Sequence, residues 1–320
     1  MTRRDCVRLL SGTAVAVFSP ATASINYQSV HARYRADATI SFLGIPIFSR
    51  NGVGSGYAVF EEERGDGERT LGLQFAGGSW PERAAGLNKL GMIQETMHET
   101  AGSLDDATYF GFMTSAPEQN LEEARESLKK NPGKTIPFAA VEGLQKPASY
   151  SFRQVHFDQP ADASWSTWQQ LLPRVYEQFA GATAKAHRKA LTGQGPFLYC
   201  LQQILNSREK RHRTHFLYGQ KAYELHTERA PDTKMRDKLA RKGLCSADAP
   251  LDRLQGEIHG AAKGTVTKFR LWVVAGAPLP LRIELQPRSF LSLAFEKDHT
   301  LEKPAISFLL RSPAGGKKTA

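Results

Sequence analysis

Apolar and polar residues alternate with a period of two through much of the N-terminal third of the chain, as they do in half-buried β-strands. The alternation is clear at residues 30–38 and resumes after the glycine-rich stretch 52–56. The polar run 63–69 has the composition of a hairpin loop, and two further runs, 90–99 and 108–114, form a second hairpin. Strands joined by short polar loops predict an antiparallel meander.

Helical spacing of apolar residues occurs in three stretches, which are residues 115–132, 165–179 and 196–206. The first begins with a capping box, in which the Ser115 hydroxyl accepts from the Glu118 amide, and it ends at a Pro-Gly pair. Pro173 should kink or split the second, because proline lacks the amide that a helix interior requires. Trp165 and Trp168 lie on its apolar side, which is more typical of a core than of a ligand platform.

The second half of the chain returns to the strand pattern. An extended run at 150–157 is followed by a strand pair within 214–225 that turns at Gly219. Residues 230–252 are polar and charged, and they predict a surface loop or a short helix. Three more antiparallel strands with period-two alternation follow within residues 266–295.

These patterns predict an α+β fold: a strongly curved antiparallel sheet, resembling a half-barrel, with a few packing helices and two halves that are candidates for related units. We divide the chain into a leader at 1–23, a meander plus helix at 24–132, a curved sheet with helices at 133–310 and a flexible tail at 311–320. One continuous sheet and two separate domains are both compatible with the pattern.

The first 23 residues have the three parts of a bacterial secretory leader. Arg3 and Arg4 supply positive charge, the apolar run 9–18 follows, and small residues up to Ala23 place the cleavage site after that residue. The adjacent arginines favour the twin-arginine route, and the general secretory route is the alternative. Either route predicts a periplasmic or secreted protein. The apolar run is too short for a transmembrane segment.

The formal net charge of +10 favours an anionic partner. The leader holds three arginines and one aspartate, so about +8 remains once it is removed. In a periplasm the candidate partners are lipid, lipopolysaccharide, an acidic glycan or an envelope protein, and a nucleic acid is not expected. The densest basic cluster, residues 208–213, lacks the interleaved aromatic residues of a stacking platform, and we interpret it as a solvated turn between a helix and a strand.

Two cysteines, Cys200 and Cys245, remain after the leader is removed. In an oxidising compartment they are a candidate disulfide. The alternative is favoured because Cys200 lies in an apolar run, where a buried thiol acts as a small hydrophobic side chain. The chain has no CxxC, zinc-type or haem-attachment spacing, so we expect no metal and no cofactor.

Other stretches contain reactive residue types without the spacing that catalysis requires. Ser55 lacks the flanking glycines of a nucleophile elbow, and the stretch 52–57 fails the dinucleotide-binding pattern, so a glycine-rich bulge is favoured. His98 has no second histidine four residues later, and His212 and His215 should point to opposite faces of a strand. We interpret the acids near His98 as the wet face of a hairpin; they are Glu95, Glu99, Asp105 and Asp106.

The second half combines an apolar helix at 197–201, a strand pair around 218–223 and closing segments at 269–272 and 279–284. With these segments, residues 150–297 resemble a family of secreted bacterial proteins known as a domain of unknown function of the 3108 type. The resemblance implies a fold similar to the lipoprotein carriers LolA and LolB, in which a strongly curved antiparallel sheet wraps around helices, and it implies an envelope location. It brings no catalytic signature.

The resulting hypothesis is a noncatalytic envelope protein that binds an amphipathic or anionic ligand, or a partner protein, in the hollow of its curved sheet. The candidate contacts are basic and aromatic residues near the rim, namely Arg270, Trp272, Arg282 and Arg288. The alternative is a periplasmic hydrolase whose site assembles only in three dimensions, with His98 or His156 as the base. We assign no catalytic residue from the sequence.

Overall fold

The computed structural model describes residues 26–42, 45–84, 88–114, 135–160, 163, 165–187, 195–219, 221–260, 266–288 and 291–301. The strands are β1 (Asn26–Phe42), β2 (Ile45–Gly65), β3 (Glu68–Ser79), β4 (Leu90–Thr100), β5 (Ser103–Thr114), β6 (Thr135–Lys146), β7 (Ser149–Pro160), β8 (Lys185–His187), β9 (Arg211–Tyr218), β10 (Lys221–Pro231), β11 (Leu251–His259), β12 (Val266–Val274), β13 (Arg282–Arg288) and β14 (Leu291–Lys297). The helices are η1 (Trp165–Thr167), α2 (Trp168–Ala180), α3 (Phe197–Asn206) and α4 (Thr233–Arg241).

The strands form one 14-stranded sheet in the order β8-β7-β6-β5-β4-β3-β2-β1-β14-β13-β12-β11-β10-β9. All neighbouring strands in this sheet are antiparallel. Strands that follow one another in the chain lie side by side, and the pairing of β1 with β14 joins the two halves of the sheet. The sheet is open, with β8 and β9 at its edges.

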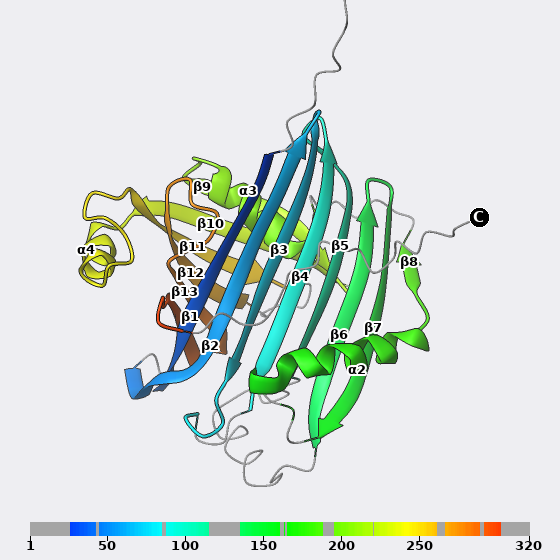
Figure 1. Ribbon diagram of the computed structural model, residues 1–320, viewed down its shortest axis with the longest axis horizontal. Coiled ribbons are helices and arrows are strands. Elements are labelled where there is room, and N and C mark those ends of the chain that lie inside the picture. Colours follow the sequence, from blue (N-terminus) through cyan, green and yellow to red (C-terminus); the bar gives the residue numbers. More distant parts are fainter. Residues whose placement is uncertain are drawn as a thin grey trace, which may run out of the picture.

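The sheet curls back on itself, so that β9 to β13 lie behind the N-terminal strands (Figure 1). The turn after β9 reaches β5 and β7: the Gly219 amide donates to the Tyr109 hydroxyl at 3.0 Å, and the Tyr150 hydroxyl donates to the Gly219 carbonyl at 2.9 Å. The rings of Tyr218 and Tyr109 pack with their centroids 5.3 Å apart. Gly111 is required beneath them, because a Cβ there would lie 2.3 Å from the Tyr218 hydroxyl oxygen.

Helix α3 fills the concave side of the sheet. Cys200 and Ile204 pack against β9 to β12, whereas Leu198 and Tyr199 pack against β2 to β5. The helix is apolar on most of its surface, as a helix enclosed between two layers requires. A curved sheet wrapped around a helix is therefore present.

Side chains from both halves of the sheet hold the ends of α3. The N-cap residue Pro196 offers no side-chain acceptor, and Glu95 of β4 accepts instead from two amides of the first turn, each at 2.8 Å. At the other end, Arg229 of β10 donates to the carbonyls of the last turn at 2.9 and 3.2 Å. The two Glu95 oxygens thus satisfy amides that the helix leaves unpaired at its N-terminus, and the positive Arg229 at the C-terminus complements the helix dipole.

The convex face of β2 to β7 is covered by η1 and α2, as Figure 1 shows for α2. Trp165 and Trp168 are buried in this cluster and stack with centroids 5.8 Å apart, which confirms them as core residues. The predicted split at Pro173 is wrong, because α2 continues through that residue, whereas a kink at Pro173 stays a prediction. Pro173 is on the exposed side of the helix, where water can hydrate the carbonyl that loses its amide partner.

The predicted antiparallel curved sheet is confirmed, but the described chain is mostly β rather than a balanced α+β fold. The predicted helix at 115–132 and the domain boundary after residue 132 lie outside the described residues. The strands on either side of that boundary belong to the same sheet.

The glycine-rich bulge is confirmed: β2 has a register irregularity where Gly52 adopts a φ of +63°. No helix within the described ranges has the length and apolar character needed to cross a membrane.

Candidate functional site

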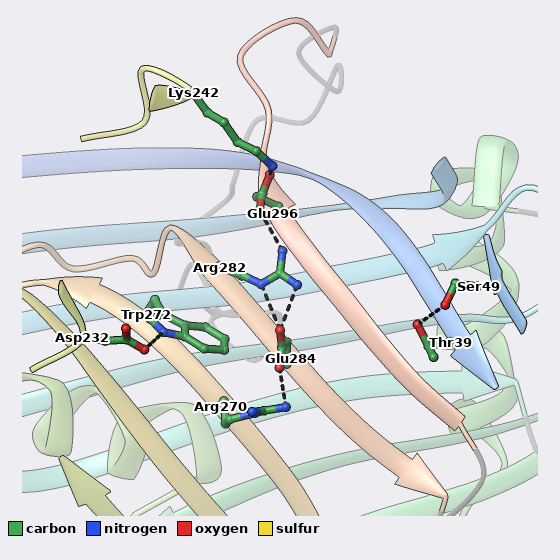
Figure 2. A network of polar contacts seen from close by, with 9 residues as sticks. All are labelled: Thr39, Ser49, Asp232, Lys242, Arg270, Trp272, Arg282, Glu284 and Glu296. Carbon is green, nitrogen blue, oxygen red and sulfur yellow. Dashed lines mark hydrogen bonds and ion pairs between the residues drawn. The ribbon is translucent and has the colours of Figure 1, made fainter. Parts of the chain in front are cut away.

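An ion-pair ladder crosses the outer face of β12, β13 and β14 (Figure 2). Arg282 donates to Glu296 Oε2 at 2.7 Å and to Glu284 Oε1 at 2.8 Å. Arg270 Nη2 lies 2.7 Å from Glu284 Oε2, and Lys242, which follows α4, pairs with the other oxygen of Glu296. The charges alternate in sign along the ladder, so each acid is shared by two bases.

The ladder is held by charge at neutral pH. Burial alone would raise the pKa of Glu296, but Lys242 and Arg282 outweigh burial and lower that pKa. For Arg282, burial would lower the pKa, and Glu284 and Glu296 raise it. Only 14% of the Arg282 side chain and 7% of the Glu296 side chain are exposed, so the loss of either partner would leave a poorly solvated charge.

Trp272 lies beneath the two arginines of the ladder. The guanidinium carbons of Arg270 and Arg282 are each 5.8 Å from its ring centroid, and its indole Nε1 donates to Asp232 at 2.9 Å. Asp232 also caps α4 by accepting from the Met235 amide. Because Trp272 is only 3% exposed and Arg282 is also largely covered, the group that faces solvent here is the half-exposed guanidinium of Arg270.

A polar groove lies beside Arg270 on the outer face of β11 to β14. Its polar lining consists of Gln255, Glu257, Lys268, Arg270, Glu284, Gln286 and Ser292, with Gly256, Phe269 and Leu285 also contributing. Lys268 pairs with Glu257 at 3.5 Å, in addition to the pairing of Arg270 with Glu284. The groove therefore offers positive charge, negative charge and side-chain amides within a short distance.

The structure brings together three of the four residues selected from the sequence. Trp272 and Arg282 are opposite each other in the register of β12 and β13, and Arg270 lines the groove beside them. Arg288 ends β13 opposite Leu291, and its side chain lies outside the described part of the chain. Whether these residues contact a ligand stays a prediction.

The comparisons with known proteins identify no family. No family model matches the chain, and no curated protein matches it significantly. Among solved structures, it is similar to the crystal structure of a β-barrel-like protein of domain of unknown function DUF1849 from Brucella abortus. The identity is 10%, the match covers 84% of this chain and 96% of that chain, and the TM-score is 0.39. The resemblance to the 3108-type family thus stays a prediction.

The expected ligand hollow on the concave side is occupied by α3 and by charged residues. Arg69 bridges Glu62 at 2.6 Å and Glu99 at 3.0 Å, and the Tyr199 hydroxyl of α3 donates to Glu99 at 2.6 Å. The interpretation of Glu95 and Glu99 as part of a wet face is wrong, because alternation along β4 turns both inward. Burial raises the pKa of Glu95 to about 8, although it accepts from the amides of α3.

The two histidines considered as bases lie on different strands. His98 of β4 contacts Thr70 at 3.2 Å and Asp106 at 3.9 Å, and its side chain is largely exposed. His156 of β7 contacts Gln154 at 3.2 Å on an exposed part of the sheet. His98 contacts the Thr70 hydroxyl, which is a nucleophile type, but the pair is exposed and no described oxyanion donor or hydrogen-bonded third group completes a catalytic site, so the hydrolase alternative gains no support beyond this one contact.

The candidate disulfide between Cys200 and Cys245 is absent, because the two thiols are free. Cys200 is buried in the cluster between α3 and β9 to β12, whereas Cys245 packs beside α4. Burial raises the pKa of Cys200 to about 12, which keeps this thiol protonated and unreactive. The favoured interpretation of Cys200 as a small hydrophobic side chain agrees with this packing.

The basic cluster at 208–213 spans the connection from α3 to β9 and continues into β9. Within the strand, Arg213 pairs with Glu224 and Arg211 with Glu228, so acids of β10 compensate part of its charge. Sequence reasoning missed Glu224, Glu284 and Glu296 as partners of basic residues. Alternation identified the strands, but the pairing depends on register, which the pattern of one strand does not contain.

Proposed function

We propose that this chain is an exported, noncatalytic binding protein of the bacterial envelope, and that it binds a partner protein through the polar groove on the outer face of β11 to β14. The observation that carries the proposal is the position of Lys268 and Arg270 in the lining of the groove. The same lining holds two carboxylates and two side-chain amides, namely Glu257, Glu284, Gln255 and Gln286. Export is supported by the sequence of the leader. N-terminal sequencing of the chain from an envelope fraction should give Ser24 first.

A polar partner suits this groove better than an acyl chain does. An acyl chain placed over Lys268, Arg270 and Glu284 would remove water from these groups without supplying hydrogen bonds, which is unfavourable for each of them. A protein surface can supply both donors and acceptors, and arginine is enriched among the residues that dominate binding energy at protein interfaces. The apolar side of the sheet, by contrast, is already packed against α3.

Site-specific photocrosslinking in cells tests the position of the interface. A photoreactive residue replaces Gln255 or Ser292 in the groove, and Gln178 on the exposed side of α2 serves as the matched control. We expect a protease-sensitive adduct of discrete mass at the two groove positions and none at the control. Equal crosslinking at all three positions, or an adduct that contains only lipid, would contradict the proposal.

Charge reversal tests the chemistry of the same surface. Lys268→Glu should reduce the groove adduct several-fold. The substitution replaces the positive charge that pairs with Glu257 by a negative charge, and the groove then no longer has the charge pattern that its partner matches. Lys234→Glu, on the exposed face of α4, is the control with the same change of net charge and should leave the adduct unchanged. A loss that is equal in both variants would show that only net charge matters and would exclude the groove as the specific surface.

A further inference from the structure

The tripeptide pattern Glu-x-His occurs on two neighbouring strands, as Glu224 to His226 in β10 and as Glu257 to His259 in β11. The antiparallel register places Glu224 opposite His259 and His226 opposite Glu257. Residues two apart on a strand share a face, so the four side chains form a checkerboard on one face. It is the outer face, because the intervening Leu225 packs inward against the α3 cluster.

The donor atoms of this checkerboard face one another. The rings of His226 and His259 have centroids 4.6 Å apart. His226 Nε2 lies 3.1 Å from Glu224 Oε2, and His259 Nε2 lies 3.3 Å from Glu257 Oε2. Neither approach has hydrogen-bond alignment, and both Nε2 atoms are buried without a hydrogen-bond partner. Two imidazole nitrogens are therefore withdrawn from water at the same place, each facing a carboxylate oxygen in poor hydrogen-bond alignment.

The flanking strands hold the remaining oxygen of each glutamate. Arg213 and His215 of β9 contact Glu224 Oε1, the latter at 3.5 Å, and Lys268 of β12 lies 3.5 Å from Glu257 Oε1. Each Oε2 is consequently the oxygen that points toward an imidazole. Basic groups behind a carboxylate fix its orientation in the way that outer partners do around metal ligands.

We propose that Glu224, His226, Glu257 and His259 bind one divalent transition-metal ion of the zinc class. Two imidazole nitrogens and two carboxylate oxygens are donors that Zn²⁺ accepts in tetrahedral geometry, at about 2.0–2.2 Å. In the described ranges no three His, Cys, Asp or Glu side chains already stand in metal-binding geometry, so the ion must draw the donors together. These side chains are 22 to 39% exposed, so the two imidazoles can rotate toward the Oε2 atoms while the flanking basic groups hold each Oε1.

Metal titration of the full chain without a polyhistidine tag, after treatment with a chelator, tests the site. We expect calorimetry with Zn²⁺ to give one ion per chain, and Co²⁺ to give the intense visible absorption of a tetrahedral complex. The double variant His226→Ala/His259→Ala should lose at least tenfold in affinity together with the Co²⁺ bands. Glu224→Gln/Glu257→Gln keeps the imidazoles and should weaken binding less.

His31→Ala/His156→Ala is the matched control, because it removes two exposed histidines elsewhere in the sheet. It should bind Zn²⁺ and Co²⁺ as the parent chain does. Circular dichroism is used to check that each variant is folded. We expect each to fold, because the substituted side chains are at least partly exposed. Absence of stoichiometric binding to the parent chain, or an equal loss in the control, would overturn the site and leave only adventitious coordination by surface histidines.

Discussion

Gly111→Ala tests whether the C-terminal strands pack on the N-terminal half of the sheet. The added Cβ would lie 2.3 Å from the Tyr218 hydroxyl oxygen and 3.1 Å from the Met92 carbonyl oxygen. Overpacking of this kind costs about 1–3 kcal/mol, and the reduced entropy of the unfolded chain offsets about 0.4–1 kcal/mol. We therefore expect Gly111→Ala to lower the free energy of unfolding by about 0.5–2 kcal/mol.

The measurement is denaturant unfolding of four chains that form a double-mutant cycle with Tyr218→Phe. Without the hydroxyl, the Cζ atom of that ring lies 3.5 Å from the new Cβ, which is an ordinary contact, so Gly111→Ala should cost at least about 1 kcal/mol less in this background. Gly181→Ala is the control, because nothing lies within 4 Å of its added Cβ. Equal stabilities of Gly111→Ala and Gly181→Ala, or no relief by Tyr218→Phe, would refute the packing of β9 on β5.

Two further substitutions test the ionisable groups on either face of the sheet. Folding raises the pKa of Glu95 from 4.5 to about 8, so the free energy of unfolding should fall as pH rises between these values, by about 5 kcal/mol at most. Glu95→Gln should remove this pH dependence, as measured by denaturant titrations at about pH 5 to 9. Arg282→Met leaves Glu284 and Glu296 without their shared base and should lower the midpoint of urea unfolding by an amount equivalent to about 3 kcal/mol. Arg211→Met, at the exposed pair with Glu228, is the control and should change the free energy of unfolding by less than about 1 kcal/mol. An unchanged midpoint for Arg282→Met would contradict the ladder.

Period-two alternation predicted several strands close to their observed positions, and it missed β11, where the apolar residues do not alternate. The pair β9 and β10 and the strands β12 to β14 were predicted close to their observed positions. Strand β11 was not predicted, because Leu251 packs outward with Trp272 beside α4 whereas Leu254 packs inward with α3. Two apolar residues three positions apart then look like part of a loop or helix rather than a strand.

The candidate site shows a different limit of the sequence. Arg270, Trp272 and Arg282 were selected as basic and aromatic residues on adjacent strands, and they do lie together. Their neutralisation by Glu284 and Glu296 depends on the register of β12 to β14, and the ring of Trp272 is covered as a result. The Glu-x-His repeat was overlooked for the same reason, since two-residue patterns become a cluster only when the strands are aligned.

The position of α3 determines which face of the sheet is accessible to a partner. A lipid on the concave side would have to displace a helix that buries Tyr199 and Ile204, and that is held at its ends by Glu95 and Arg229 from opposite halves of the sheet. Each large apolar side chain that leaves its packed site loses about 1.5–3 kcal/mol, so displacement of the whole helix would cost on the order of 5–10 kcal/mol. The outer groove requires no such rearrangement, and substitutions at Lys268 can therefore alter binding without altering the fold.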